Sequence, residues 1–393
     1  MASTRLRHVV LSLAAAALLG ACGGGGGGND APAPQPAFPP SSSLANICTP
    51  EAQKSFVRSY LDETYLWYDE IPAVNAADFA TVPDYFNALL VKPRDRFSTV
   101  LPSNIANTLQ SVPDGSVMDG NPANLMVAPG SSVPLARVVT SPSGHRVGYI
   151  LFNDHNQGAQ DQLIAAFDSM RSAGVEDLVL DMRYNTGGFL YVALSAASMV
   201  TGPSNSGRIF EQLRFSAKRQ GETAASTYRF SNLVQVAETL HPRDSELPQL
   251  GLRRLYVLSS ERTCSASESI VNSLRGVDVE VILVGGTTCG KPYGFHRQDN
   301  CGLAFFAIEF QGYNAKNYGD YTSGFPATCP VQDNLTSTLG STSEPLLAAA
   351  LHHVDTGSCP APAASAASRG MPDVLRLNAP LSARQPWDGR ILK

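Results

Sequence analysis

Two side chains in this sequence, Ser265 and Lys291, have the chemistry of a hydrolytic dyad. Ser265 begins the stretch SASES shortly after the apolar run RLYVLSS, and Lys291 ends the stretch GGTTCGK. A serine hydroxyl becomes a nucleophile when a neighbouring base takes its proton, and a lysine amine can be that base once burial keeps it uncharged. The residue types therefore predict a serine–lysine dyad, with Ser265 as nucleophile and Lys291 as general base.

The same stretch also admits structural and rival chemical explanations. Ser265 and Glu268 have the S-x-x-E spacing of a helix capping box, which requires no catalysis. Ser267 is a second candidate nucleophile, although on a helix it would face about 200° away from Ser265. Cys264 is a third, although its side chain should point into the preceding strand. The residue types alone leave these alternatives open.

A lysine base has to be desolvated, and the residues after Lys291 suit this purpose. Pro292, Tyr293 and Phe295 can form apolar walls around the amine, where an ammonium ion would be poorly solvated. A histidine is the alternative base. His296 is the histidine nearest to the site in sequence. The candidates for that role are four histidines: His155, His296, His352 and His353.

Alternating strands and helices are predicted to position these side chains. Strand-like apolar runs at 147–152, 177–182, 253–260 and 279–284 alternate with helical patterns at 160–175, 189–200 and 265–276. This alternation predicts an α/β fold with a mostly parallel β-sheet and crossover helices. The turns RYNTGG, SASES and GGTTCGK each follow one of these strands. They should meet at the carboxyl edge of the sheet, where open α/β sheets bind their ligands.

Smaller elements are expected on both sides of this core and add α+β character at the ends. A small helical unit should occupy 46–100, with helices over 50–71 and 83–91, and a poorly patterned linker should follow at 101–146. After the α/β core we expect aromatic strands over 303–311 and a last helix over 343–354. The expected catalytic domain is 147–358, and 359–393 form a low-complexity tail.

Residues 1–21 have the pattern of a bacterial lipoprotein signal. Arg5 and Arg7 precede an apolar stretch too short to span a bilayer, and the tripeptide LGA leads to Cys22. Cys22 would be lipidated, and the Gly- and Pro-rich residues 22–45 would form a disordered tether. A simple secretory signal is the alternative. We expect a periplasm-facing lipoprotein of the cell envelope, and the lack of an aspartate after Cys22 favours the outer membrane.

Charge and composition narrow the classes of function. The formal net charge of −5 becomes −7 when the two arginines of the signal are lost, which argues against a nucleic-acid partner. No later stretch is long and apolar enough to cross a membrane, so membrane contact is expected through the lipid alone. No CxxC or His–Cys spacing is typical of a metal site, and no cofactor is implied.

Six further cysteines suggest disulfides, because an exported chain folds in an oxidising compartment. Cys48 and Cys359 flank the folded region and could join its ends. Cys264 precedes the candidate nucleophile and Cys289 lies two residues before the candidate base, so a bridge between them would fix the dyad. A Cys301–Cys329 bridge is the alternative to that pairing, and both could coexist.

The segments GVEDLVLDMRYNTGG, RTCSASES and GGTTCGK, in this order, resemble the C-terminal processing (tail-specific) serine peptidases. The resemblance covers about 147–355, and DRFS at 95–98 resembles a segment before the regulatory domain of that family. It implies polypeptide substrates. It also implies roles for individual residues: Ser265 as nucleophile, Lys291 as base, and an oxyanion hole from the N–H of Ala266 and of a glycine, Gly187 or Gly188.

The sequence departs from that family in two respects. Many members carry a PDZ domain after the DRFS segment, but only 48 residues separate Ser98 from Val147 here, so we expect a remnant at most. Some members place a glutamine four residues after the base to orient it. Phe295 stands at that position here, and Gln298 is close enough in sequence to substitute for the glutamine.

These features together predict a lipid-anchored endopeptidase that hydrolyses peptide bonds through an acyl-enzyme. One alternative is a non-catalytic lipoprotein that binds peptides or apolar ligands on the same fold. Another is an esterase or amidase that acts on a small molecule with the same dyad. Retention of both Ser265 and Lys291 favours a hydrolase, because a binding module needs neither.

Overall fold

The computed structural model describes residues 38–111, 131–334, 337–361 and 390–391. Contacts divide the chain into two units after Ala37, and the described residues belong to the second unit, which begins at Phe38. The predicted signal sequence, Cys22 and most of the predicted tether lie outside the described residues, as do parts of the predicted linker and tail. Within the described residues, no helix is long and apolar enough to cross a membrane.

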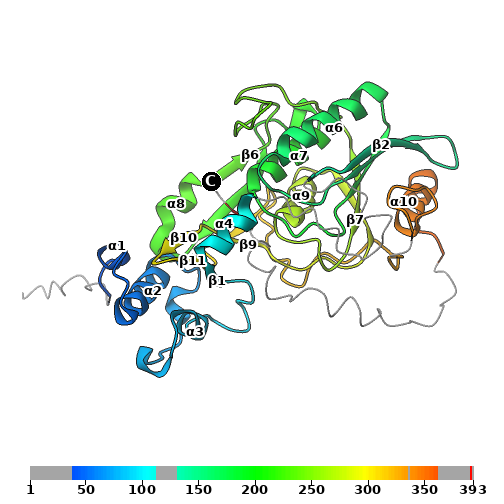
Figure 1. The fold of residues 1–393 in the computed structure, drawn as a ribbon. Coiled ribbons are helices and arrows are strands. Elements are labelled where there is room, and N and C mark those ends of the chain that lie inside the picture. Colours follow the sequence, from blue (N-terminus) through cyan, green and yellow to red (C-terminus); the bar gives the residue numbers. More distant parts are fainter. Residues whose placement is uncertain (1–37, 112–130, 335–336, 362–389, 392–393) are drawn as a thin grey trace, which may run out of the picture. The chain divides into compact units, whose positions relative to one another are not determined.

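A six-stranded sheet lies at the centre of the fold (Figure 1). In spatial order its strands are β13 (Cys329–Pro330), β8 (Glu280–Gly285), β7 (Arg254–Ser259), β4 (Asp177–Asp181), β3 (Arg146–Leu151) and β2 (Leu135–Thr140). β13, β8, β7, β4 and β3 run parallel, and β2 alone pairs in the antiparallel direction. The prediction of a mostly parallel α/β sheet is therefore confirmed.

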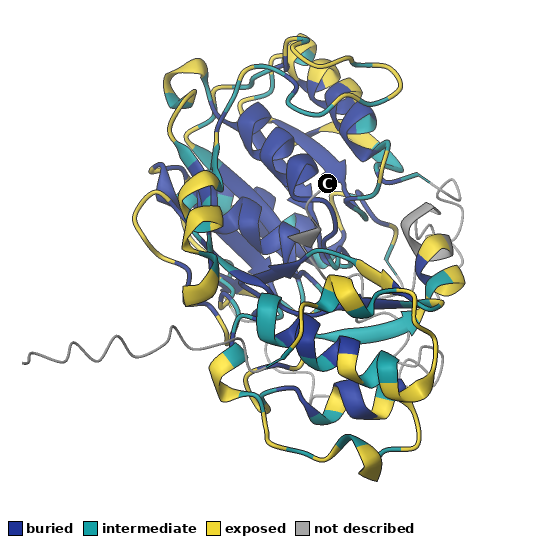
Figure 2. Ribbon diagram, turned by 90° about the vertical axis from the view of Figure 1, so that its left-hand side faces the viewer, coloured by how far each residue is buried: buried dark blue, intermediate teal, exposed yellow. Residues whose placement is uncertain are grey.

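Helices cover both faces of this sheet. They are α6 (Ala159–Ala173), α7 (Leu190–Val200), α9 (Ala266–Gly276) and α10 (Pro345–Thr356). Leu178 and Leu180 of β4 pack in one apolar cluster with α6, α7 and α9, and Val179 between them packs in a second cluster with α10. All of β4 is buried, as expected for a parallel strand covered on both sides. Figure 2 shows strands and helices in the interior of the fold as buried.

The three motif turns lie at one edge of the sheet, because they follow three neighbouring parallel strands. RYNTGG follows β4, SASES follows β7 and GGTTCGK follows β8. The strand ends are joined by hydrogen bonds from Met182 N–H to Leu258 O (3.0 Å) and from Gly286 N–H to Ser259 O (2.8 Å). Turns that are up to about 100 positions apart in the sequence thus lie side by side at this edge of the sheet.

Two smaller sheets flank this core. The first contains β14 (Arg390–Ile391), β9 (Tyr293–Phe295), β12 (Phe310–Tyr313), β5 (Ile209–Phe215) and β6 (Thr227–Arg229). The second contains β1 (Thr99–Pro102), β11 (Leu303–Phe306) and β10 (Gln298–Asn300). The prediction of aromatic strands over 303–311 is therefore confirmed. The apolar run is divided between two sheets, β11 in one and β12 in the other.

The N-terminal residues form the predicted helical unit. It contains α1 (Ser41–Leu44), α2 (Pro50–Thr64), α3 (Val82–Ala88) and α4 (Ser103–Ser111). Neither α1 nor α4 was predicted, and α1 lies in residues that were expected to belong to the disordered tether. Thr49 caps α2, which ends at Thr64, earlier than its predicted end near Pro72. The α2 residues Phe56 and Tyr60 pack on Phe305 of β11 at ring distances of 6.0 and 6.2 Å, so the unit is joined to the smaller sheet.

Three disulfides are present, and two differ from the expected pairs. Cys264 is bonded to Cys289, the bridge expected between the two motif turns. The Cys48–Cys359 and Cys301–Cys329 pairs are wrong, because the structure joins Cys48 to Cys301 and Cys329 to Cys359. The first of these bridges fastens the start of α2 to the turn between β10 and β11, and the second fastens β13 to the segment after α10.

Candidate active site

Ser265 is held in an unusual backbone conformation at the start of α9. Its φ is +56° and its ψ is −112°, a region that residues with a side chain rarely adopt. The side chains of Ser265 and Glu268 take the positions of the predicted capping box, and Ser265 N–H donates to Glu268 Oε2 at 3.0 Å. The buried Ser265 hydroxyl makes no well-formed hydrogen bond among the described residues. A strained backbone with an available hydroxyl is typical of a functional serine.

The buried carboxylate of Glu268 connects the serine turn to the lysine turn. Its Oε2 accepts the N–H of Ser265 at 3.0 Å and the N–H of Lys291 at 2.8 Å. Its Oε1 accepts the N–H of Gly290 at 2.9 Å and the hydroxyl of Thr288 at 2.5 Å. Burial raises the pKa of Glu268, and these hydrogen bonds oppose that effect. One side chain therefore fixes the backbones of both candidate catalytic residues.

The Cys264–Cys289 disulfide makes a second connection between the same turns. Its Cα atoms lie 5.1 Å apart, and the N–H of Cys289 also donates to Thr263 O at 3.0 Å. The two sulfur atoms and the Glu268 carboxylate form a group whose ligand atoms lie within 4.8 Å of one another. Because the sulfurs are bonded to each other, this group offers no thiolate to a metal ion, and Cys264 offers none as a nucleophile.

The Lys291 amine is enclosed by aromatic rings. The residue is fully buried, and its Nζ lies 4.9 Å from the ring centres of both Phe97 and Phe295. Each aromatic face attracts a desolvated ammonium ion by about 2 kcal/mol. Burial opposes that attraction, because removing an ammonium ion from water costs several kcal/mol, and the dyad requires the amine to be neutral. Of the predicted wall residues, Phe295 makes this contact directly.

Phe97 was not predicted as part of the site, and it belongs to the segment DRFS. The Asp95 carboxylate shapes this segment by accepting the N–H of Phe97 at 3.0 Å and of Ser98 at 2.8 Å. Arg96 then donates to the carbonyl oxygens of Cys289 (2.9 Å) and Thr322 (3.2 Å). The segment DRFS was recognisable in the sequence. Its contact with Lys291 was not predicted, because Phe97 lies 194 residues before Lys291.

The RYNTGG turn touches the serine through Gly187. A Cβ placed on Gly187 would lie 2.9 Å from Ser265 Cβ and 3.0 Å from the Ala266 nitrogen, so only glycine fits there. The Gly187 N–H itself donates to Asn185 Oδ1 at 3.0 Å. Within the described part of the chain, the N–H groups of Gly188 and Ala266 donate no backbone hydrogen bond. They are the two amides of the predicted oxyanion hole that are left for a ligand.

Other candidate residues lie away from a catalytic position. Gln298 is exposed on β10 and donates to Asp299 O, so the structure does not place it as an orienting partner of the buried Lys291. The Ser267 hydroxyl donates to Asn185 O at 3.0 Å, which leaves Ser265 as the available serine of the two. Nδ1 of His296 lies 2.8 Å from Glu309.

The other three candidate histidines lie in two places, on α10 and beside the RYNTGG turn. His352 and His353 lie on α10, which packs on the face opposite to α9. His155, which sequence proximity ranked behind His296, is fully buried and contacts the RYNTGG turn: its N–H donates to Gly187 O at 3.3 Å. This hydrogen bond connects His155 to the candidate site.

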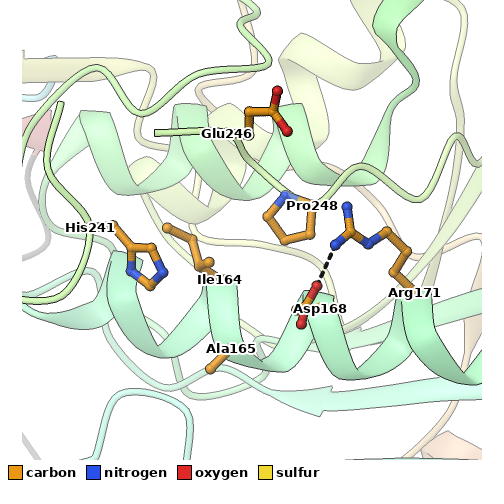
Figure 3. Close-up of a pocket in the computed structure, with 7 residues that line it drawn as sticks. All are labelled: Ile164, Ala165, Asp168, Arg171, His241, Glu246 and Pro248. Carbon is orange, nitrogen blue, oxygen red and sulfur yellow. Dashed lines mark hydrogen bonds and ion pairs between the residues drawn. The ribbon is translucent and has the colours of Figure 1, made fainter. Parts of the chain in front are cut away.

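A separate cavity of about 270 Å³ lies outside this site (Figure 3). Its walls come from α6 and the segment 241–248, and Figure 3 shows Asp168 paired with Arg171 on its rim. None of its lining residues belongs to the three motif turns: Ile164, Ala165, Asp168, Arg171, His241, Glu246 and Pro248. The cavity is therefore not part of the candidate site.

Comparisons with known proteins agree with this geometry. The family described as "Peptidase family S41" matches residues 146–321, and "Peptidase S41 N-terminal domain" matches residues 52–99. A carboxyl-terminal-processing protease from Picosynechococcus sp. is 25% identical over 181 residues, which are 45% of this chain and 38% of that protein. The match thus spans less than two fifths of that relative.

Among solved structures, one with a TM-score above 0.5 supports the fold. A putative S41 protease from Bacteroides fragilis superposes with a TM-score of 0.58 and 21% identity, over 77% of this chain and 97% of that one. A photosystem II D1 C-terminal processing protease gives a TM-score of 0.46 and 15% identity, over 72% and 93% of the two chains. The two family matches include the DRFS segment and all three motif turns. This chain belongs to peptidase family S41, a family of serine-type peptidases with a serine–lysine dyad.

Proposed function

We propose that this protein is an endopeptidase that cleaves polypeptides with Ser265 as nucleophile and Lys291 as general base. The observation that carries the proposal is the shared carboxylate of Glu268, which binds the backbone N–H of both residues. The burial of Lys291 between two aromatic rings supports the role of a neutral amine. The strained conformation of Ser265 supports the role of a nucleophile.

The reaction follows from these positions. Ser265 Oγ attacks the scissile carbonyl carbon while its proton passes to Lys291 Nζ, and the carbonyl oxygen becomes an oxyanion. The N–H groups of Ala266 and Gly188 would donate to that oxygen, at the positive end of α9. Lys291 then returns the proton to the leaving amine, which leaves an acyl-enzyme. A water molecule, deprotonated by the same amine, releases the acyl group and restores Ser265.

The test compares the purified mature protein with Ser265→Ala and Lys291→Met variants. Each is incubated with a reduced, unfolded protein, and the products are identified by mass spectrometry. The proposal predicts internal cleavage by the wild type and a loss of at least about a thousandfold in each variant. Cleavage that survives in the Ser265→Ala variant overturns it. Inactivity of all three proteins together with retention of a specific peptide would instead favour a binding lipoprotein.

We also propose that the protein is a lipoprotein of the cell envelope, anchored through Cys22 and facing the periplasm at the outer membrane. The sequence pattern of 1–21 supports this location, and so do the three disulfides, which persist in oxidising compartments. Labelling of cells with a palmitate analogue should mark the wild type and not a Cys22→Ser variant. Membrane fractionation then separates the outer membrane from the inner one, and a label-free soluble protein contradicts the anchor.

The substrates of this site are proposed to be selected without a complete PDZ domain. Only 43 residues lie between the end of β1 and the start of β3, and β2 occupies six of them. Selection of a free C-terminus, if it occurs, then depends on the catalytic domain. A pair of substrates with the same cleavage site, one with a free and one with an amidated C-terminus, measures this directly. Equal kcat/KM for the two is the expected result.

A further inference from the structure

His155 is a buried histidine on the opposite side of the RYNTGG turn from Ser265. It lies in the loop between β3 and α6, and its side chain is fully buried beside Phe152, at a ring distance of 4.4 Å. Its Nδ1 lies 2.9 Å from Asn185 Oδ1. Its Nε2 is also buried and has no hydrogen-bond partner among the described residues. A buried polar atom without a partner is rare enough to require an explanation.

The hydrogen bonds of Asn185 determine which nitrogen of His155 carries the proton. Asn185 Nδ2 donates to Phe152 O at 3.0 Å, which fixes the orientation of the carboxamide. Asn185 Oδ1 can therefore only accept, and it accepts from both Gly187 N–H and His155 Nδ1. His155 must carry its proton on Nδ1. The unpartnered Nε2 is then an acceptor, which is neutral at ordinary pH because burial lowers the pKa of His155 to about 3.

The backbone of His155 holds the glycine turn as well. His155 N–H donates to Gly187 O at 3.3 Å, and Phe189 N–H donates to His155 O at 3.0 Å. A Cβ on Gly188 would lie 2.9 Å from both the Cβ and the carbonyl oxygen of His155. Gly187 and Gly188 are thus enclosed between His155 on one side and Ser265 on the other.

We propose that His155 is a positioning residue that sets the oxyanion-binding turn through Asn185. The Nδ1 proton fixes Asn185 Oδ1, and that oxygen holds the N–H of Gly187 away from the site, which directs the next amide, Gly188, toward a ligand. Asn185 extends the connection to the nucleophile, because its carbonyl oxygen accepts Cys264 N–H at 3.1 Å and the Ser267 hydroxyl at 3.0 Å. This inference rests on the proposed peptidase function.

The unpartnered Nε2 separates this role from a merely structural one. If His155 served packing alone, phenylalanine would give a more stable protein, because it has a similar volume and no unpaired buried acceptor. The unpaired Nε2 of His155 costs stability, so the benefit of this histidine must come from its Nδ1 proton. A His155→Phe variant should be at least as stable as the wild type while its catalysis is impaired.

The test uses three variants that differ in where they place a donor. His155→Phe has no donor, His155→Asn places its amide near the Nδ1 position, and His155→Gln places its amide near the Nε2 position. We expect His155→Phe to lower kcat by at least about tenfold with little change in KM, because the oxyanion donor is misplaced while substrate binding persists. His155→Asn should recover most of that loss and His155→Gln should not. Affinity for a peptide aldehyde, which forms a tetrahedral adduct, should fall in parallel with kcat.

The following outcomes overturn the inference, except the last, which overturns the proposed function instead. If the wild type is active and His155→Phe keeps its kcat, or if His155→Asn is no better than His155→Gln, Asn185 does not need the Nδ1 proton. If kcat falls only in proportion to a loss of folded protein, measured by thermal unfolding, the role is structural. If substitution moves the pH–rate profile, His155 takes up the reaction's proton and is a base. If the wild type itself is inactive on every polypeptide, it is the proposed function that fails, which is a distinguishable result.

Discussion

Lys291 Nζ lies 4.9 Å from the ring centre of Phe97, a residue of the N-terminal helical region that precedes the catalytic core. The candidate base is therefore completed by a segment that lies outside the α/β sheet. Arg96 strengthens this connection through its hydrogen bonds to the carbonyl oxygens of Cys289 and Thr322. The N-terminal region thus forms part of the surroundings of the candidate base.

Replacement of Phe97 by asparagine should impair the base. A polar side chain beside the amine, with the water it admits, stabilises the ammonium form and so reduces the fraction of neutral Lys291 at a given pH. We expect kcat/KM near neutral pH to fall, by about tenfold for each pH unit that the rising limb moves to higher pH. The pH–rate profile checks this. Phe97→Leu, which keeps an apolar wall, is the control, and an unmoved limb in Phe97→Asn would contradict the argument.

The positions of the strands and of the motif turns were predictable from sequence because buried parallel strands require continuous apolar runs. Ser265 and Lys291 follow two such runs, so their meeting at one sheet edge required only the order of the strands. Phe97 was not predictable in this way. Its contact with Lys291 depends on how α2 and α3 pack on the smaller sheet, which local patterns do not encode.

The cysteine pairs show the same limit. Cys264 and Cys289 lie in turns whose proximity follows from neighbouring strands, and their bridge was expected. Cys48 pairs with Cys301 because the N-terminal helices reach the β10–β11 turn, where Asn46 N–H donates to Asn300 Oδ1 at 2.8 Å. That contact depends on tertiary packing alone. The oxyanion turn was predicted in part. The sequence named both glycines as candidates, but only the structure shows that the N–H of Gly187 already donates to Asn185 Oδ1.

Removal of the Cys264–Cys289 disulfide by a double substitution to serine should lower both stability and activity. The bridge spans 25 residues, so its loss is expected to cost about 3–4 kcal/mol of unfolding free energy. It also releases one of the connections that fix Ser265 relative to Lys291, so kcat should fall by at least about tenfold in the folded variant.

The Cys329–Cys359 disulfide is the matched control for that experiment. It spans 30 residues, so its removal should cost a similar free energy of unfolding, but it lies at β13 and the segment after α10, away from both turns. Denaturant unfolding and kcat are measured for both double variants. If the two lose activity equally, the Cys264–Cys289 bridge has no special role in the dyad.

The burial of His155 predicts a dependence of stability on acid pH. Burial lowers the pKa of His155 to about 3 in the folded chain, whereas an unfolded histidine titrates near 6.5. Below about pH 6.5 the unfolded state binds a proton that the folded state does not, so stability falls as pH falls, by at most about 1.4 kcal/mol per pH unit from this residue. When the free energy of unfolding is measured with urea at several pH values between 4 and 7, it should depend less steeply on pH for His155→Phe than for the wild type. Equal slopes would show that His155 gains a proton in the folded protein.

Gly187→Ala should abolish catalysis through a steric effect. The new Cβ would lie 2.9 Å from Ser265 Cβ and from Cys264 O, so either the nucleophile or the oxyanion turn has to move. Misplacing them removes transition-state contacts, and we expect kcat/KM to fall by at least about a hundredfold. Positive φ also strains an alanine by about 1–2 kcal/mol, so Gly144→Ala serves as the control: its φ of +94° is close to the +103° of Gly187, but nothing lies within 4 Å of its new Cβ. The control should lose only the stability that its positive φ costs and keep its activity. Full activity in Gly187→Ala would show that this turn does not take part in the reaction.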